Sequence, residues 1–293
     1  MSAPATIGFV GLGQMGGPMA SFVAKGPTPL ICFDTVSGLA PEGARETDSL
    51  SALIAEADTI FLSLPDGKIV NAVAAEIAAI ATGTDVAGKV IIDMSTIGPI
   101  AAKEAAATLT NAGLTFIDAP VSGGRQGALK ASITIIWAGP EAELERHRPI
   151  IDLFCANAFH VGVEPGQGQA VKLLNNFLSA TAMAATSEAV LFGLSHGVEM
   201  KSILDVVKVS TGNNTAVADK FPNRILTETY DAGFFAELMN KDVQLYRQFV
   251  EEAGTPNQMG TQVAEIWQKV EDSLPAKSDF TRVYKVLESR IKS

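Results

Sequence analysis

Short apolar runs alternate with longer helical stretches through the first half of this sequence. The runs are rich in Val, Ile and Phe, as strands are. They lie at 6–11, 29–34, 58–65, 89–95, 114–120, 132–139 and 159–162. Between them, segments such as 72–81 and 100–112 space their apolar residues as helices do. This alternation predicts a mostly parallel sheet with helices on both faces.

The hydrophobic pattern changes after residue 163. The stretch 166–196 is dense in Ala, Leu, Val and Met and predicts one helix of roughly 40 Å. Three further runs keep the helical period without any sign of a strand, and lie at 205–210, 241–254 and 262–274. We therefore expect an α/β domain at 1–163 and an all-helical domain at 164–293, joined by the long helix.

Composition and charge narrow the class of protein. The chain has 293 residues, of which 47% are hydrophobic and 18% charged, which is enough apolar material for two ordinary domains. With 22 Lys+Arg against 32 Asp+Glu, the net charge is −10 at pH 7. An acidic chain of this kind is not expected to bind nucleic acid.

Three features bear on the compartment. Residues 1–6 lack the basic region and apolar stretch of a secretory signal, and no run of about 18 uninterrupted apolar residues follows. Cys32 and Cys155 each lie in an apolar segment without a C-x-x-C partner. We expect a soluble, cytoplasmic protein without membrane contact, with both cysteines buried as free thiols.

A glycine-rich segment follows the first apolar run and opens a helix. It reads Gly11, Leu12, Gly13, Gln14, Met15 and Gly16. In a βαβ unit the first glycine allows a tight turn, the second lets the backbone approach a pyrophosphate, and the third lets helix and strand pack closely. Flavin dinucleotides and S-adenosylmethionine also bind glycine-rich turns, and an ordinary strand-to-helix turn uses glycine too. The motif alone therefore leaves the ligand open.

An acidic residue ends the second apolar run. Asp34 comes 18 residues after Gly16, where a carboxylate can accept hydrogen bonds from the adenine ribose hydroxyls. Residues 35–37 include no cation that could hold a phosphate on that ribose. The alternative is a solvated loop carboxylate. The sequence thus favours NAD over NADP and predicts a doubly wound Rossmann domain.

Three later segments place polar and small residues in an apolar context. They read Asp118-Ala119-Pro120-Val121-Ser122-Gly123-Gly124, Gly168-Gln169-Ala170-Val171-Lys172-Leu173-Leu174-Asn175-Asn176 and Leu238-Met239-Asn240-Lys241-Asp242. With the glycine-rich opening, these segments make the sequence resemble the β-hydroxyacid dehydrogenase family. The resemblance runs over nearly the whole chain, and the four motifs occur in the family's order.

The resemblance implies an NAD(P)-dependent oxidation of a hydroxyl β to a carboxylate, or the reverse reduction, without a metal ion. The lysine that matches Lys172 is the family's general acid/base, and the asparagine that matches Asn176 fixes the substrate. The loop that receives the substrate carboxylate corresponds to Ser122, Gly123 and Gly124. The lysine that matches Lys241 borders both nicotinamide and substrate.

Other implications concern the cofactor and the assembly. Family positions that line the cofactor correspond to Leu64, Pro65, Ser95, Thr96 and Phe234. The long helix matches the family's interdomain helix, which implies an active site in the cleft between the domains. Relatives are commonly dimers or tetramers, so a homodimer or homotetramer is expected.

The residue types at these positions suit the chemistry. Hydride departure from a carbinol carbon requires a proton to leave its oxygen, and a desolvated lysine can take or return that proton. Asn176 lies one helical turn beyond Lys172, and Asn175, at i+3, is the second candidate for a substrate contact. The competing interpretations are a buried polar network for the helix, a flexible turn for 122–124 and an exposed charge pair for Lys241 and Asp242.

The sequence departs from the family pattern after the second glycine of 123–124. Arg125 places a guanidinium beside the expected carboxylate loop, where it could bind a second anionic group or point into solvent. Asn213 and Asn214 fall where relatives have a variable loop on the substrate side. Both are therefore candidates for setting specificity.

Together these observations predict NAD-dependent oxidation of a small β-hydroxyacid, such as 3-hydroxyisobutyrate, to its semialdehyde or keto acid. A reductase of short aldehyde acids, such as glyoxylate, succinic or tartronate semialdehyde, is the alternative within enzymes. A dinucleotide-binding sensor without turnover is the alternative outside them, although it would not need Lys172 and Asn176. The three histidines are scattered singly, and no metal site is expected.

Overall fold

The computed structural model describes residues 4–81 and 88–289. Residues 1–3, part of the segment considered for a secretory signal, lie outside the described residues. The chain divides into two compact units, Met1–Lys172 and Leu173–Ser293, which we describe separately.

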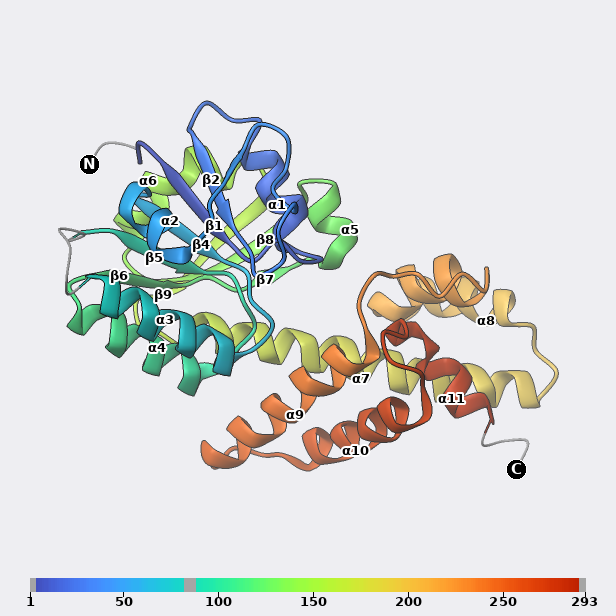
Figure 1. The fold of residues 1–293 in the computed structure, drawn as a ribbon. Helices are drawn as coiled ribbons and strands as arrows, with labels where there is room; N and C mark the ends of the chain where they lie inside the picture. The colour runs from blue at the N-terminus through green and yellow to red at the C-terminus, as the bar shows by residue number, and fades with distance from the viewer. Residues whose placement is uncertain (1–3, 82–87, 290–293) are drawn as a thin grey trace. The chain divides into compact units, whose positions relative to one another are not determined.

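The first unit is built on one sheet of nine strands (Figure 1). The strands are β1 Ile7–Val10, β2 Leu30–Phe33, β3 Arg45–Glu46, β4 Thr59–Leu62, β5 Val90–Asp93, β6 Thr115–Asp118, β7 Val121–Ser122, β8 Ile133–Ala138 and β9 Cys155–Gly162. Their order is β3-β2-β1-β4-β5-β6-β8-β7, with β9 also paired to β8. The strands from β3 to β6 are parallel, whereas β8 runs antiparallel to β6 and β7 and parallel to β9. The expected mostly parallel sheet is confirmed.

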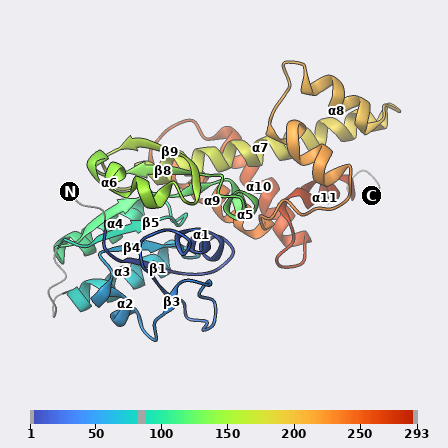
Figure 2. The ribbon, with the colours of Figure 1, turned by 90° about the horizontal axis from the view of Figure 1, so that it is seen from above.

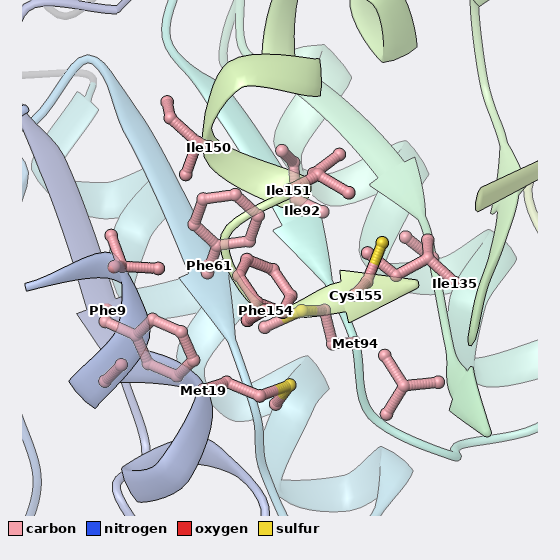
Figure 3. Close-up of a cluster of buried hydrophobic side chains, with 14 of the residues drawn as sticks. Phe9, Met19, Phe61, Ile92, Met94, Ile135, Ile150, Ile151, Phe154 and Cys155 are labelled. Atoms are coloured by element: carbon pink, nitrogen blue, oxygen red, sulfur yellow. The ribbon is translucent and has the colours of Figure 1, made fainter. Parts of the chain in front are cut away.

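Helices cover both faces of this sheet. They are α1 Gly16–Val23, α2 Leu50–Glu56, α3 Gly67–Ala81, α4 Pro99–Asn111, α5 Gly124–Leu129 and α6 Glu141–Ile151. Successive residues of a strand point to opposite faces, so Phe9 joins the apolar cluster with α1 and α6 while Val10 joins the one with α2, α3 and α4. In the first cluster the Phe61 ring lies 6.0 Å from each of Phe9 and Phe154 (Figure 3).

Three short elements were not predicted from the sequence. The strands β3 and β7 have two residues each, too few for an alternation of apolar and polar positions to register. The helix α5 occupies the segment after Gly123, which its composition did not mark as helical.

The second unit contains helices and a single isolated β-bridge among its described residues, between Phe235 and Asp279. The helix α7, Gln167–Ser195, begins in the first unit. The other elements are α8 Met200–Lys208, the π-helix η1 Ala216–Ile225, α9 Ala236–Glu252, α10 Gln258–Ser273, the 3-10 helix η2 Phe280–Arg282 and α11 Val283–Ser289. The antiparallel pair α9 and α10 lies side by side (Figures 1 and 2). Phe221 and Trp267 are fully buried in the core, and the all-helical prediction is confirmed.

Both cysteines are buried and free, as the sequence predicts. Burial raises the pKa of the Cys32 thiol to about 12 and that of Cys155 to about 11. Neither thiol is therefore ionised at neutral pH, which suits a packing role.

Candidate active site

The glycine-rich segment lies where the strand order of the sheet reverses. β2 and β3 continue the sheet on one side of β1, and β4, β5 and β6 continue it on the other. Loops that follow β1 and β4 therefore leave in opposite directions, and in doubly wound sheets this divergence opens the ligand-binding crevice. Residues 11–16 follow β1, and Leu64 and Pro65 follow β4.

The backbone of this segment depends on two of its glycines. Gly11 has a φ of +89°, and a Cβ there would collide with the carbonyl oxygen of Ser63. A Cβ on Gly16 would collide with the carbonyl oxygen of Gly11. At Gly13, by contrast, no heavy atom lies within 4 Å of the position that a Cβ would take. This open backbone at the start of α1 fits a dinucleotide pyrophosphate.

Asp34 ties the glycine-rich segment to the end of β2. Its Oδ2 accepts a hydrogen bond from the backbone N–H of Leu12 at 2.6 Å, and its Oδ1 accepts one from Val36 at 2.9 Å. The carboxylate is half-buried beside the turn that it holds. It is thus fixed at the position from which this type of domain contacts the adenine ribose.

The loop after β5 is fastened to the loop after β4. Ser95 Oγ accepts a hydrogen bond from the N–H of Leu64 at 2.9 Å, and the N–H of Ser95 donates to Asp93 Oδ1 at 3.0 Å. Asp93 is fully buried, and its Oδ2 has no hydrogen-bond partner in residues 4–81 and 88–289. Burial raises the pKa of Asp93 to about 7, and the nearby charge of Asp118 acts in the same direction. Thr96 therefore lies in a loop whose first residue, Ser95, is hydrogen-bonded both to the loop after β4 and to the end of β5.

The expected carboxylate loop is a strand end followed directly by a helix. Ser122 ends β7, Gly123 has a φ of +128°, and Gly124 has a φ of +60° and begins α5. A Cβ on Gly123 would lie 3.2 Å from the Cα of Ile133. Arg125 follows in the first turn, and its Nε is shielded from solvent without a hydrogen-bond partner in the described part of the chain.

The helix α7 carries the polar residues that the sequence singles out. Lys172 is 8% exposed and Asn176 is 7% exposed, one helical turn further on. In the second unit, Asn176 Nδ2 donates to Asp242 Oδ2 on α9 at 2.6 Å. Asp242 Oδ1 pairs with Lys241 Nζ at 3.3 Å, and Asn175 Nδ2 donates to Asn176 Oδ1 at 3.3 Å. The structure thus brings four polar residues of α7 and α9 together.

Both halves of the chain match families of known proteins. The NAD binding domain of 6-phosphogluconate dehydrogenase matches residues 6–162, and the NAD-binding domain of NADP-dependent 3-hydroxyisobutyrate dehydrogenase matches residues 166–287. Among curated proteins, the 2-(hydroxymethyl)glutarate dehydrogenase of Eubacterium barkeri is 31% identical over 96% of this chain and 94% of its own. The chain belongs to the β-hydroxyacid dehydrogenase family.

Two further relatives agree with this assignment. An NAD-dependent L-serine dehydrogenase of Pseudomonas aeruginosa is 32% identical over 96% of this chain and 97% of its own. The solved structure of Mycobacterium tuberculosis 3-hydroxyisobutyrate dehydrogenase with L-serine is similar with a TM-score of 0.88 at 31% identity, covering 98% of this chain and 99% of that one.

Membership of the β-hydroxyacid dehydrogenase family confirms the resemblance seen in the motifs. The chain is an NAD-dependent oxidoreductase that acts on CH–OH groups. The helix α7 is long and apolar enough to cross a membrane, but the central helix of a soluble protein meets the same criteria. One such helix among the described residues is weak evidence for a membrane span.

Several buried polar residues near these motifs carry roles that the sequence did not show. Asp242 is 2% exposed, so it does not form the exposed charge pair considered as an alternative for Lys241. Asp118 and Gln169 are both fully buried and bonded to each other. Burial raises the pKa of Asp118 to about 6, although hydrogen bonds from Gln169 and Gly166 oppose the shift. In the sequence, each of the three appears only as a polar residue within one of the segments 118–124, 168–176 and 238–242.

Two candidate residues in the second unit have local partners. Asn214 Oδ1 accepts hydrogen bonds from the N–H groups of Ala216 and Val217 at the start of η1, and its Nδ2 donates to Thr186 Oγ1 at 3.1 Å. This is a helix cap. Phe234 packs edge-on against Phe280 with the ring centroids 6.0 Å apart. Asn214 and Phe234 thus each have a structural contact within the second unit.

The histidines and acidic residues form no metal centre in residues 4–81 and 88–289. His147 is fully buried, with Nε2 2.8 Å from Thr59 Oγ1 and Nδ1 2.7 Å from the carbonyl oxygen of Glu143. Burial lowers the pKa of this imidazole, so it is neutral at physiological pH. His147 is therefore a bonded core residue.

Proposed function

We propose that this chain oxidises a small β-hydroxyacid of the 3-hydroxyisobutyrate kind to its semialdehyde, with Lys172 as general base and without a metal ion. The observation that carries the proposal is the pair of polar residues Lys172 and Asn176, buried on successive turns of the Ala- and Leu-rich helix α7. Burying the Lys172 amine removes it from water, which costs free energy, and a residue needed only for packing would not require an amine. We propose that residues 1–163 bind the dinucleotide and that 164–293 supply the lysine.

The reaction requires the hydroxyl proton and a hydride to leave together. The Lys172 Nζ takes the hydroxyl proton while the hydride departs from the carbinol carbon, which becomes the aldehyde carbon. NAD, when bound, accepts that hydride at its nicotinamide ring. In the reverse direction the Lys172 ammonium returns the proton to the aldehyde oxygen.

Substrate binding uses polar residues from three of the motifs. Asp242 holds the Asn176 amide in one orientation, so that Asn176 can fix the substrate hydroxyl without losing its position. The backbone N–H groups of Gly123 and Gly124, with the Ser122 hydroxyl, are suited to a carboxylate. Asn175 and Lys241 are secondary contacts in this proposal.

Cofactor binding uses the loops at the reversal of strand order. The N–H groups of residues 13–16 face the pyrophosphate, whereas Gly11 and Leu12 donate theirs to Phe33 and Asp34 and so shape the turn. Asp34 accepts hydrogen bonds from the adenine ribose. Support comes from the open backbone at Gly13 and from the fixed Asp34 carboxylate. In this proposal the nicotinamide side of the cofactor is lined by Leu64, Pro65, Thr96, Phe234 and Lys241.

The test is a screen for NADH formation by the full chain with 3-hydroxyisobutyrate, L-serine and 2-(hydroxymethyl)glutarate, with glyoxylate and semialdehydes run in reverse. Each acid is offered with NAD and with NADP. We expect turnover of at least one acid, faster with NAD by about tenfold, because the Asp34 carboxylate repels a ribose phosphate. No reduction of NAD by any acid, and no oxidation of NADH by any aldehyde, would contradict the proposal.

A specific observation favours a dianionic substrate. The Arg125 guanidinium follows the proposed carboxylate loop directly, and its shielded Nε lacks a partner in the described residues. An arginine so placed can hold a second carboxylate by two parallel hydrogen bonds. The Eubacterium barkeri relative is named for a substrate of this kind, a dicarboxylate.

Within the same screen, the Arg125→Ala variant should raise the KM for 2-(hydroxymethyl)glutarate about tenfold or more, because hydrogen bonds to charged groups contribute about 1.5–3 kcal/mol. The KM for 3-hydroxyisobutyrate should change less than twofold. The control is Lys130→Ala, which removes an exposed cation just after α5. Equal effects on the two acids would end the dianion proposal.

We also propose that the protein is a cytoplasmic homodimer or homotetramer. Leu174, Leu178 and Phe192 are exposed at a spacing that places them on one face of α7, which supports association of copies through that face. The free, buried Cys32 and Cys155 are consistent with a reducing compartment, which cell fractionation would test.

A further inference from the structure

The first turn of α7 contains a buried amide whose four hydrogen-bonding positions are all used. Gln169 Oε1 accepts from the backbone N–H groups of Ile97 at 2.9 Å and Gly98 at 3.1 Å. Its Nε2 donates to the carbonyl oxygen of Ser95 at 3.1 Å and to Asp118 Oδ1 at 2.8 Å. Only an amide supplies two acceptor and two donor positions from one planar group.

The same amide is joined to a carboxylate that caps α7. Asp118, at the end of β6, accepts at Oδ2 from the backbone N–H groups of Gly166 at 2.9 Å and Gln169 at 3.2 Å. The helix N-terminus thereby gains a negatively charged partner from the sheet. A Cβ on Gly168 would lie 2.9 Å from the carbonyl oxygen of Ile136 and 3.0 Å from Asp118 Oδ2, so the helix start is pressed against the sheet.

These bonds connect two segments that the proposed reaction needs. The loop 95–98, which contains Thr96, is held by Gln169 on one side and by the bond from Leu64 to Ser95 on the other. Lys172 follows Gln169 by three residues in the same helix. All of these residues belong to the first unit, so the connection does not depend on the second.

We propose that Gln169 is a positioning residue, which holds the Lys172 turn of α7 in register with the cofactor loop 95–98. The inference rests on the proposed function. Gln169 fixes both segments at once, so the Lys172 amine meets the hydroxyl proton at the place where the cofactor loop directs the hydride. Loss of such alignment by about 1 Å can lower a rate a hundredfold.

The test compares Gln169→Met with Gln167→Met. Methionine keeps the length of the side chain and removes all four bonds, whereas Gln167 is exposed and its amide accepts only from the N–H of Glu164 at 2.9 Å among the bonds described for it. We expect kcat per folded molecule, with NAD and the acid that the wild type oxidises fastest, to fall tenfold or more in Gln169→Met. It should stay within twofold of the wild type in Gln167→Met.

A second readout needs no turnover. The N–H groups of Ile97 and Gly98 lose their acceptor in Gln169→Met, so hydrogen exchange of the peptide covering 95–98 should be at least tenfold faster than in Gln167→Met. Unchanged exchange, or a kcat within twofold of the wild type, would overturn the proposal. A wild type without turnover would overturn the proposed function and this role with it, whereas an active wild type with an equally active variant would overturn this role alone.

The Gln169→Glu variant covers the case in which Gln169→Met does not fold. It keeps an acceptor for Ile97 and Gly98 but sets a carboxylate against Asp118, with the buried Asp93 on the neighbouring strand. A proton shared between carboxyl groups restores a donor at low pH. The ratio of variant to wild-type kcat should therefore rise as the pH falls from 8 to 5, and a ratio that does not change with pH would contradict the role.

Discussion

Among the carboxylates that the structure describes, Asp93 has the environment least like that of an exposed carboxylate. It is fully buried, it accepts a hydrogen bond from the backbone N–H of Ser95, and burial raises its pKa from 3.8 to about 7. The folded chain therefore binds a proton at pH 5 to 6 that the unfolded chain has released. The free energy of unfolding must then fall as the pH rises through this range, by at most about 1.4 kcal/mol per pH unit for one proton.

The Asp93→Asn variant should remove this contribution. Its free energy of unfolding should decline less steeply than that of the wild type between pH 5 and 7, and the two curves should run parallel above about pH 8, where Asp93 is ionised in both states of the wild type. Asp118, whose raised pKa has the same sign, is retained in both proteins. Urea unfolding at a series of pH values measures the two slopes; equal slopes throughout would show that Asp93 is ionised in the folded chain.

At the same scale, the sequence revealed some site residues and concealed others. Gly11 and Gly16 were predictable because the neighbouring backbone leaves no space for a Cβ, so only glycine fits at these positions. Asp118, Gln169 and Asp242 were not, because their partners lie 51 and 66 residues away and no local spacing encodes those bonds. The roles of Lys172 and Asn176 stay predictions.

At the scale of the element, the hydrophobic periodicity predicted long helices and strands better than short ones. The 29 residues of α7 and the strands β1, β2, β4, β5, β6 and β8 were indicated by their hydrophobic pattern. Of β9, Cys155–Gly162, only residues 159–162 were indicated, because most of its side chains are not buried. The two-residue strands β3 and β7 were not, since the pairing of a strand that short is decided by its neighbours in the sheet. The π-helix η1 was missed because no distinct spacing of apolar residues marks its wider turn.

The exposed face of α7 gives a prediction at this scale. Leu178 is 60% exposed and Phe192 is 68% exposed, which is unusual for large apolar side chains on one face of a long helix. If copies associate through that face, the wild type has a molar mass above the 30.7 kDa of one chain, and Leu178→Glu shifts it toward that value. Light scattering on the purified proteins measures the mass.

The control for this change is Gln262→Glu, which adds the same charge at an exposed polar position of α10. It should keep the mass of the wild type. A wild type of 30.7 kDa, or a Leu178→Glu variant with an unaltered mass, would show that α7 does not form the interface.

The whole molecule consists of two compact units that share the helix α7. The first unit offers the glycine-rich turn, Asp34 and the held loop 95–98, and the second offers Asn176, Asp242 and Lys241. These groups belong to the four family motifs, which follow one another along the chain. The fold class followed from the hydrophobic pattern together with the glycine-rich segment, whereas the hydroxy acid does not follow from either, because its recognition depends on a few side chains.

The most direct measurement is the rate of NADH formation by Lys172→Ala beside that of the wild type, with the same acid and saturating NAD. Loss of a positioned general base should lower kcat by roughly 10² to 10⁴, while the dissociation constant for NADH, followed by fluorescence, stays within about threefold. The control Lys103→Ala, at an exposed position of α4, should keep the wild-type rate. A Lys172→Ala variant that turns over as fast as the wild type would contradict the account.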